Sequence, residues 1–201
     1  MNQLDDLRKF YELKKDGIRK FINTCSYNDD DCLFGELCFC ILTPQSRAKN
    51  CREAINKLKN DKKLFTADLE ELLDYLKGVR FPKVKAERIV EAREKLPELK
   101  AMLKSEKLRE WLMENVNGLG PKESAHFMRN IGFKGLPIID VHIQNFLRKV
   151  GKYKEEGSLT KKRYNELENK FLELAKEMKI PPEELDIAIW LYQSGENEFY
   201  G

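Results

Sequence analysis

The stretch of sequence that decides the fold is Val116-Asn117-Gly118-Leu119-Gly120-Pro121-Lys122. Two glycines flank one apolar residue, which predicts a tight turn between two helices with Leu119 pointing into the protein. Proline fits the first position of the second helix, because it has no amide hydrogen to lose there. The backbone amides of such a turn are expected to face outward and to bind an anion such as a phosphate. An ordinary corner between two helices is the alternative.

Lys122 lies in the first turn of the helix that follows this turn. The positive end of the helix dipole disfavours a charged ammonium at that place and favours the neutral amine. A lysine acts as a nucleophile in its neutral form, so Lys122 is a candidate nucleophile. The alternative is an exposed lysine without a chemical role.

An acidic residue follows eighteen residues later, in Ile138-Ile139-Asp140-Val141-His142. Asp140 is predicted to cap a helix over 141–150, with β-branched residues before it that bury its surroundings. A simple capping role is the alternative to a catalytic one. The two roles are compatible, because a cap fixes the orientation of the carboxylate.

The remaining sequence predicts helices joined by short loops. Apolar residues recur at spacings of three and four, and no alternating pattern typical of strands occurs. The segment 32–42 is apolar at nearly every position, which indicates a helix buried on most sides. Thr66 is predicted to cap a helix that ends before Gly78. Further helices are expected over 4–22, 47–58 and 81–95, around 108–112 after Pro97, and over 121–131, 164–178 and 182–194. The fold class is therefore all-α.

Composition excludes several classes of protein. The 201 residues are 41% hydrophobic and 35% charged, which is typical of a globular chain and not of a disordered one. No apolar run approaches the roughly 18 residues needed to span a bilayer. The first residues lack the basic and apolar blocks of a signal peptide, so a cytoplasmic protein is expected.

Basic residues are concentrated in two stretches, although the net charge is only +3. Residues 47–63 contain seven Lys or Arg against two acids, and residues 77–100 contain eight against four. Such stretches suit contacts with a phosphate backbone. A solvated helix face is the alternative.

The five cysteines are Cys25, Cys32, Cys38, Cys40 and Cys51. An odd count in a cytosolic chain argues against a disulfide framework. Cys32, Cys38 and Cys40 lie in an apolar run and are expected to be buried thiols. Because no CxxC pair occurs and the two histidines are distant in sequence, no zinc or iron–sulfur site is expected, and no side-chain motif predicts another metal site.

The turn with Lys122, followed at this distance by Asp140-Val141-His142, resembles the helix-hairpin-helix DNA glycosylase superfamily that includes endonuclease III. More narrowly, the chain is similar to the short 8-oxoguanine DNA glycosylase/lyases of archaea and some thermophilic bacteria. The segments Leu37-Cys38-Phe39-Cys40-Ile41-Leu42-Thr43-Pro44-Gln45 and Val79-Arg80-Phe81, and the late Trp190, carry this narrower resemblance. It extends over most of the chain.

The resemblance implies an enzyme that turns the damaged nucleotide out of duplex DNA before excising the base. Lys122 would attack C1′ and displace 8-oxoguanine, and the resulting Schiff base would permit β-elimination of the strand. Asp140 would stabilise positive charge on the sugar and assist proton transfer. No redox or nucleotide cofactor is needed.

Further roles are implied for other residues. Phe81 and Trp190 would hold the extruded base between them, although either could instead belong to the core. Gln45 aligns with a glutamine that fills the vacated stack, and an ordinary loop glutamine is the alternative. His142, Arg80, Gly118 and Gly120 would contact the DNA.

The resemblance also implies an architecture of two helical subdomains with a DNA-binding cleft between them. A helical barrel with the hairpin would comprise 30–134, and the second subdomain would comprise 1–29 and 135–201. The partner would be duplex DNA, and no coiled-coil seam suggests more than a monomer. The same chemistry on an oxidised pyrimidine or an alkylated purine, and a hairpin module that only binds DNA, are the alternative functions.

Two departures from the family pattern matter. Endonuclease III relatives often carry a four-cysteine iron–sulfur loop near the C-terminus, and no cysteine follows Cys51 here. The archaeal enzymes read the base partly with the carboxylate of a terminal lysine. This chain ends Glu198-Phe199-Tyr200-Gly201, which puts that detail of recognition in doubt.

Overall fold

The computed structural model describes residues 3–22, 25–154, 157 and 159–195. These residues form eleven α-helices and no strand, so the all-α prediction is confirmed. They fall into two compact units. We call residues 25–131 the hairpin unit, and residues 3–22 with 132–195 the terminal unit.

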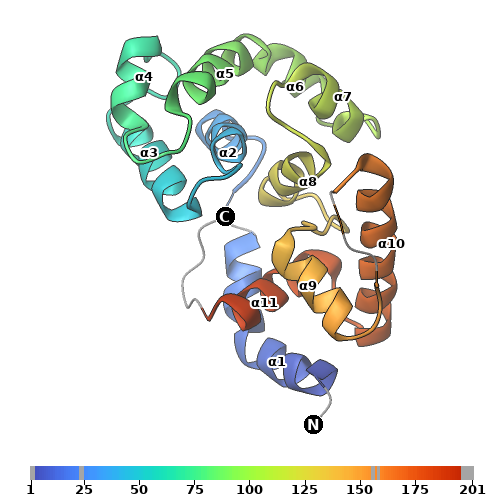
Figure 1. Cartoon of the computed structure of the whole chain (residues 1–201). Coiled ribbons are helices and arrows are strands. Elements are labelled where there is room, and N and C mark those ends of the chain that lie inside the picture. Colours follow the sequence, from blue (N-terminus) through green and yellow to red (C-terminus); the bar gives the residue numbers. More distant parts are fainter. Residues whose placement is uncertain (1–2, 23–24, 155–156, 158, 196–201) are drawn as a thin grey trace. The chain divides into compact units, whose positions relative to one another are not determined.

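The hairpin unit is built around the helix α2, Asp30–Leu42. Every residue from Leu33 to Leu42 is buried, which confirms the prediction of a helix enclosed on most sides. Three helices pack against it, α3, α5 and α8 (Figure 1). The other helices of the unit are α3 (Ala48–Asn60), α4 (Leu69–Tyr75), α5 (Pro82–Glu94), α6 (Leu96–Met102), α7 (Leu108–Asn115) and α8 (Pro121–Asn130).

A buried polar network fixes α8 to α2. Glu36 of α2 is 6% exposed and accepts a hydrogen bond from Asn130 of α8 at 2.8 Å. Arg52 of α3 forms an ion pair with the other oxygen of this carboxylate and donates at 3.0 Å to the oxygen that Asn130 binds. Because a buried carboxylate is stable only when it is paired, these contacts hold α8 in one position on α2.

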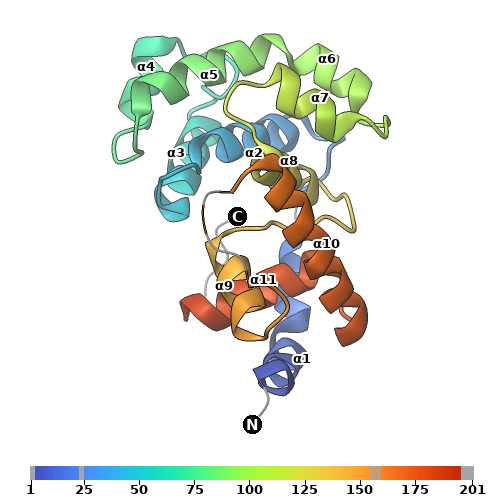
Figure 2. The same ribbon diagram turned by 45° about the vertical axis from the view of Figure 1, so that its right-hand side comes forward.

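The terminal unit consists of α1 (Gln3–Ile22), α9 (Val141–Lys149), α10 (Lys161–Met178) and α11 (Pro182–Ser194). The helices α1 and α9 both pack on α11, and α1 lies with α11 in both views (Figures 1 and 2). Their apolar faces meet in one core cluster, which includes Leu7, Ile18, Phe146, Phe171 and Leu185. The apolar spacing read from the sequence therefore marks the faces that pack.

Three local expectations are wrong. Asp68, not Thr66, caps α4, because its carboxylate accepts the Glu71 amide while Glu71 accepts the Asp68 amide, a reciprocal capping box. The short helix α6 was not expected as a separate element. A disulfide joins Cys25 to Cys32, because the turn before α2 brings their Cα atoms to 5.8 Å.

The other cysteine expectations hold in part. Cys38 and Cys40 are buried free thiols, as expected, and so is Cys51. No helix among the described residues is long and apolar enough to cross a membrane.

Candidate active site

The predicted hairpin is present between α7 and α8. Gly118 has φ +97°, in the left-handed region that only glycine adopts without strain. A Cβ at this position would lie 2.8 Å from Nη1 of Arg88. Leu119 points inward and is 5% exposed, as predicted. The two glycines and the apolar residue between them therefore set the shape of this turn.

Two backbone amides of the hairpin donate hydrogen bonds within the protein, whereas the sequence predicted that they would be free to bind an anion. The Leu119 amide donates to the carbonyl of Val116 at 3.2 Å, and the Gly120 amide donates to the carboxylate of Glu123 at 3.2 Å. The expectation that these amides are free to bind an anion is therefore wrong for both residues. Glu123 closes the N-terminus of α8 through a capping contact that its spacing of three residues from Gly120 makes available.

Lys122 occupies the first turn of α8, directly after the hairpin. Its side chain is partly exposed, and no carboxylate among the described residues of its unit forms an ion pair with it. Arg109 of α7 donates to the carbonyl of Pro121 at 3.2 Å, which fixes the start of α8 to α7. Lys122 is therefore carried on a corner whose position is fixed by contacts with α7.

Asp140 is the N-cap of α9, as predicted. Its Oδ1 accepts a hydrogen bond from the Ile143 amide at 3.0 Å, and the side chain is partly exposed. This contact holds one carboxylate oxygen and leaves Oδ2 in a fixed direction. His142 follows in the first turn of α9, and its carbonyl accepts from Nε2 of Gln193 at 2.8 Å. Asp140 and His142 thus share one helix start in the terminal unit.

Two buried acids of α11 hold the loop that leads to Asp140. Asp186 is 3% exposed, and its Oδ2 accepts from the Ile138 amide at 2.7 Å. Glu183 is 5% exposed and accepts from the Gly135 amide at 3.0 Å. Neither residue was predicted from the sequence. Asp186 could have been found from the sequence, because it stands in the apolar run Leu185-Asp186-Ile187. A carboxylate buried in such a run needs a hydrogen-bond donor.

Phe81 is 51% exposed, so the alternative of a core position is wrong for this residue. It has φ 57° and lies at the N-cap of α5. The guanidinium of Arg80 lies 5.0 Å from the centre of its ring. An exposed aromatic ring beside a cation suits stacking on a base and contact with a phosphate.

The other two candidates lie in different units. Gln45 is exposed in the loop after α2 and has φ 57°. Trp190 of α11 is partly exposed and packs against the core cluster of the terminal unit. The structure thus places Gln45, Arg80, Phe81 and Lys122 in the hairpin unit, and Asp140, His142 and Trp190 in the terminal unit.

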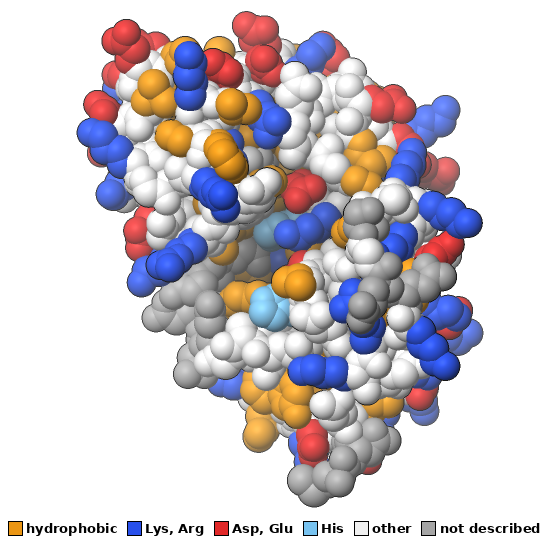
Figure 3. Space-filling view, in the orientation of Figure 1, with side chains coloured by type: hydrophobic (Ala, Val, Ile, Leu, Met, Phe, Trp, Pro, Cys, Tyr) orange, Lys and Arg blue, Asp and Glu red, His pale blue; other side chains and the backbone are white. Residues whose placement is uncertain are grey.

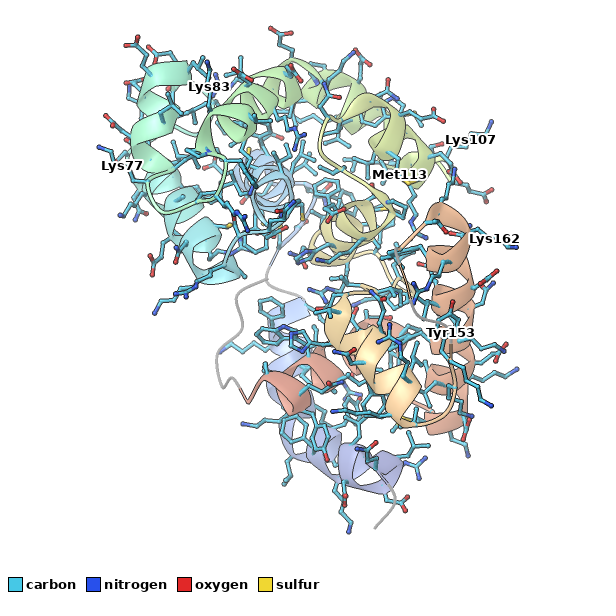
Figure 4. The ribbon with its side chains drawn as sticks, viewed as in Figure 1. Lys77, Lys83, Lys107, Met113, Tyr153 and Lys162 are labelled. Atoms are coloured by element: carbon cyan, nitrogen blue, oxygen red, sulfur yellow. A yellow bond between two sulfur atoms is a disulfide. The ribbon has the colours of Figure 1, made fainter. Side chains whose placement is uncertain are left out.

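Several residues of the two basic stretches have internal partners. Lys85 is 2% exposed, Arg52 pairs with Glu36, and Arg93 donates to the carbonyls of Leu64 and Ala67. Others extend into solvent, among them Lys77 and Lys83 at the outer edge of the unit (Figure 4). Basic and acidic side chains lie intermixed over α3 to α6 on the face drawn in Figure 3. The number of basic residues in these stretches is therefore larger than the number that contribute positive charge to the surface.

No group of three or more His, Cys, Asp or Glu side chains among the described residues is arranged to hold a metal ion. The C-terminal residues Glu198 to Gly201 lie outside the described part of the chain.

Comparison with known proteins gives one consistent result. A family model described as 8-oxoguanine DNA glycosylase matches residues 14–180. An 8-oxoguanine DNA glycosylase/AP lyase of Fusobacterium nucleatum is 35% identical over 192 residues, which cover 90% of this chain and 88% of that protein. The crystal structure of the 8-oxoguanine DNA glycosylase of Thermotoga maritima has a TM-score of 0.86 and 31% identity, and covers 98% of both chains. The Methanocaldococcus jannaschii 8-oxoguanine glycosylase/lyase in complex with a 15mer DNA containing 8-oxoguanine has a TM-score of 0.82 and 34% identity, and covers 96% of this chain and 99% of that one.

Proposed function

Because this chain belongs to the 8-oxoguanine DNA glycosylase family, we propose that it excises 8-oxoguanine from duplex DNA and then cleaves the strand as an AP lyase. The observation that carries the proposal is Lys122 in the first turn after a Gly118 hairpin, in a chain that matches the family over residues 14–180. The match covers the hairpin and Asp140 together.

The nucleophile of the proposed reaction is the amine of Lys122. Its Nζ forms a bond to C1′ of the extruded nucleoside, while the glycosidic bond breaks and 8-oxoguanine leaves with that electron pair. The C1′–O4′ bond of this adduct then breaks, O4′ takes a proton, and Nζ forms a double bond to C1′. The resulting Schiff base makes a C2′ proton acidic. Loss of this proton eliminates the 3′ phosphate and nicks the strand.

Asp140 supplies the negative charge that the proposed reaction needs. Positive charge develops on the sugar as the base departs, and a carboxylate held in a fixed direction stabilises it without reorganisation. The cap contact to the Ile143 amide gives Asp140 that fixed direction. When the neutral amine of Lys122 forms its bond to C1′, its nitrogen must lose a proton. Asp140 also accepts or relays this proton.

DNA contacts in the proposal come from both units. Phe81 and Trp190 stack on the extruded base, and Gln45 and Arg80 enter the place that it leaves. Gly118 and Gly120 contribute the compact turn that lets the DNA backbone approach, and His142 contacts a phosphate beside Asp140. Residues 30–134 then form the hairpin subdomain, and residues 1–29 with 135–201 form the second. We propose that the protein acts as a monomer on DNA in the cytoplasm, at the nucleoid.

Borohydride trapping tests this proposal. The wild-type protein is incubated with a duplex containing 8-oxoguanine opposite cytosine, and borohydride reduces the Schiff base to a stable adduct. We expect a covalent protein–DNA adduct with wild type and none with Lys122→Gln. Equal trapping by both proteins would show that another amine reacts. A parallel panel with thymine glycol and alkylated purines separates base specificity from mechanism, since excision of those bases and not 8-oxoguanine would overturn the assigned substrate.

A further inference from the structure

Lys85, in the first half of α5, has an unusual environment for a lysine. Only 2% of the residue is exposed, and its amine donates three hydrogen bonds: to the carbonyl of Leu42 at 2.6 Å, to the carbonyl of Pro44 at 2.8 Å and to Oγ of Ser46 at 2.8 Å. No carboxylate among the described residues pairs with it. All three acceptors belong to the end of α2 and the loop that follows it.

Ser46 connects this loop to a second one. Its hydroxyl oxygen accepts from Lys85 and also from the backbone amide of Arg80 at 3.0 Å. A parallel contact runs from Nδ2 of Asn50 to the carbonyl of Gly78 at 2.9 Å. The loops 43–46 and 78–81, more than thirty residues apart in sequence, are thereby joined through Ser46, which the Lys85 ammonium also binds.

Each loop carries an exposed side chain on a strained backbone. Gln45 and Phe81 both have φ 57°, which is unfavourable for residues other than glycine. Such conformations persist where surrounding contacts determine them, and they gather at functional sites. Arg80 also lies in the second loop, with its side chain exposed and its amide bound to Ser46.

We infer that Lys85 and Ser46 are positioning residues that hold loops 43–46 and 78–81 together as one rigid unit, so that Gln45 and Arg80 enter the duplex while Phe81 meets the extruded base. This inference deepens the proposed function and rests on it. Neither residue touches the reacting atoms, and each acts through the loops that it holds.

The energetic cost of Lys85 supports a role beyond filling space. Burial lowers the pKa of Lys85, because an ammonium group loses its hydration in this environment. A methionine or leucine would fill the same volume without that cost. An ammonium offers three directed hydrogen bonds, and the end of α2 and the loop 43–46 accept all three.

The test compares Lys85→Met and Ser46→Ala with wild type and with Lys104→Met, an exposed lysine outside both loops and both basic stretches. Single-turnover excision is measured on 8-oxoguanine paired with cytosine and on 8-oxoguanine in an unpaired bulge. Lyase cleavage is measured on a preformed abasic site. The last two substrates need less opening of the stack by the loops.

For Lys85→Met we expect excision of paired 8-oxoguanine to fall on the order of 10- to 100-fold, with a much smaller loss on the bulged substrate. Lyase cleavage should change by less than about threefold, because Lys122 itself is untouched. Ser46→Ala, which leaves two acceptors for Lys85, should show the same pattern in weaker form. Lys104→Met should match wild type. Equal losses on all three substrates, or full activity in both variants, would overturn the inference.

Hydrogen exchange separates this inference from the proposed function. The Arg80 amide donates to Ser46, so its exchange reports on the contact between the loops directly. We expect exchange of this amide to be about tenfold faster in Ser46→Ala than in wild type or Lys104→Met. If wild type excises no 8-oxoguanine while this amide responds as expected, the proposed substrate is wrong and the loop contact stands. An unchanged exchange rate in both Lys85→Met and Ser46→Ala would refute the contact whatever the substrate.

Discussion

The amide of Ile138 donates a 2.7 Å hydrogen bond to the buried carboxylate of Asp186, which ties α11 to the loop two residues before Asp140. The Asp140 amide in turn donates to the Ile138 carbonyl at 3.0 Å. The cap of α9 is therefore supported by an acid that lies 46 residues further along the chain than Asp140.

Replacing Asp186 by Ala should destabilise the protein, because the Ile138 amide would be left buried without its acceptor. We expect the free energy of unfolding to fall by about 1.5–3 kcal/mol, the range for a hydrogen bond to a charged group. Urea unfolding followed by circular dichroism measures this. The matched control is Asp16→Ala, which removes an exposed aspartate of α1 and should change the unfolding free energy by less than about 0.5 kcal/mol. A loss of less than about 0.5 kcal/mol for Asp186→Ala would contradict the structural role.

Asp140→Asn separates the cap from the charge at this position. Asparagine caps a helix about as well as aspartate, so the unfolding free energy should change by less than about 0.5 kcal/mol. Excision of 8-oxoguanine should fall on the order of 100-fold or more, because the amide carries no charge to stabilise the sugar cation. Single-turnover kinetics beside thermal unfolding tests both statements.

Two results would change this assignment. An active, stable Asp140→Asn would leave the residue as a cap alone. An inactive Asp140→Asn that is also strongly destabilised would be uninformative by itself, so Asp140→Ser, a second good cap without charge, provides the deciding comparison. If Asp140→Ser folds normally and retains full excision, the catalytic role is wrong.

The sequence was sufficient for features whose causes are local. The hairpin depends on Gly118 and Pro121, which act through their own backbone conformations, and the Asp140 cap depends on a helix that begins at the next residue. The buried helix α2 follows from an apolar run that leaves no polar face. These are the elements that the structure confirms.

Features that depend on distant partners were not predicted. Lys85 stands at an ordinary helical position, and its acceptors lie about forty residues earlier in the chain. Asp186 is a single acid in an apolar helix, and its donor lies 48 residues away. The alternative of a core position for Phe81 failed because the left-handed backbone at this residue turns the ring outward, which no local pattern indicates.

Phe81→Ala should leave stability nearly unchanged and reduce excision. The ring is 51% exposed, so its loss should cost less than about 1 kcal/mol of unfolding free energy. Excision of paired 8-oxoguanine should fall on the order of tenfold, because base–aromatic stacking contributes roughly 1–3 kcal/mol per base. Phe127→Ala is the contrast: the ring is fully buried, and its removal should cost about 3–5 kcal/mol. Unchanged excision with Phe81→Ala would remove this ring from the DNA contacts.

Tyr11 should make stability in alkali depend on pH. Burial, and next the hydrogen bond to the Glu184 carboxylate, raise the pKa of Tyr11 to about 12. In the unfolded chain a tyrosine titrates near pH 10, so the folded state holds the proton more tightly and this stabilisation is complete below about pH 10. It is lost as the pH rises from about 10 to 12.

The comparison of wild type with Tyr11→Phe isolates this effect, since the other tyrosines are common to both proteins. The stability advantage of wild type should shrink by about 1 kcal/mol between roughly pH 9 and pH 11. Urea unfolding at both pH values measures it. A difference that stays constant or grows with pH would have the wrong sign for a raised pKa.

Thiol labelling should distinguish Cys25 and Cys32 from the other three cysteines. In denaturant without reductant, an alkylating reagent should modify only the three free thiols, Cys38, Cys40 and Cys51, because the other two are joined in the disulfide. Reduction before labelling should raise the count to all five. Under native conditions even the three free thiols should react slowly, because burial raises the pKa of each and disfavours the reactive thiolate. Intact-mass spectrometry gives the counts, and Cys51→Ala should lower both by one. Five labels without reductant would show that Cys25 and Cys32 are thiols in the purified protein.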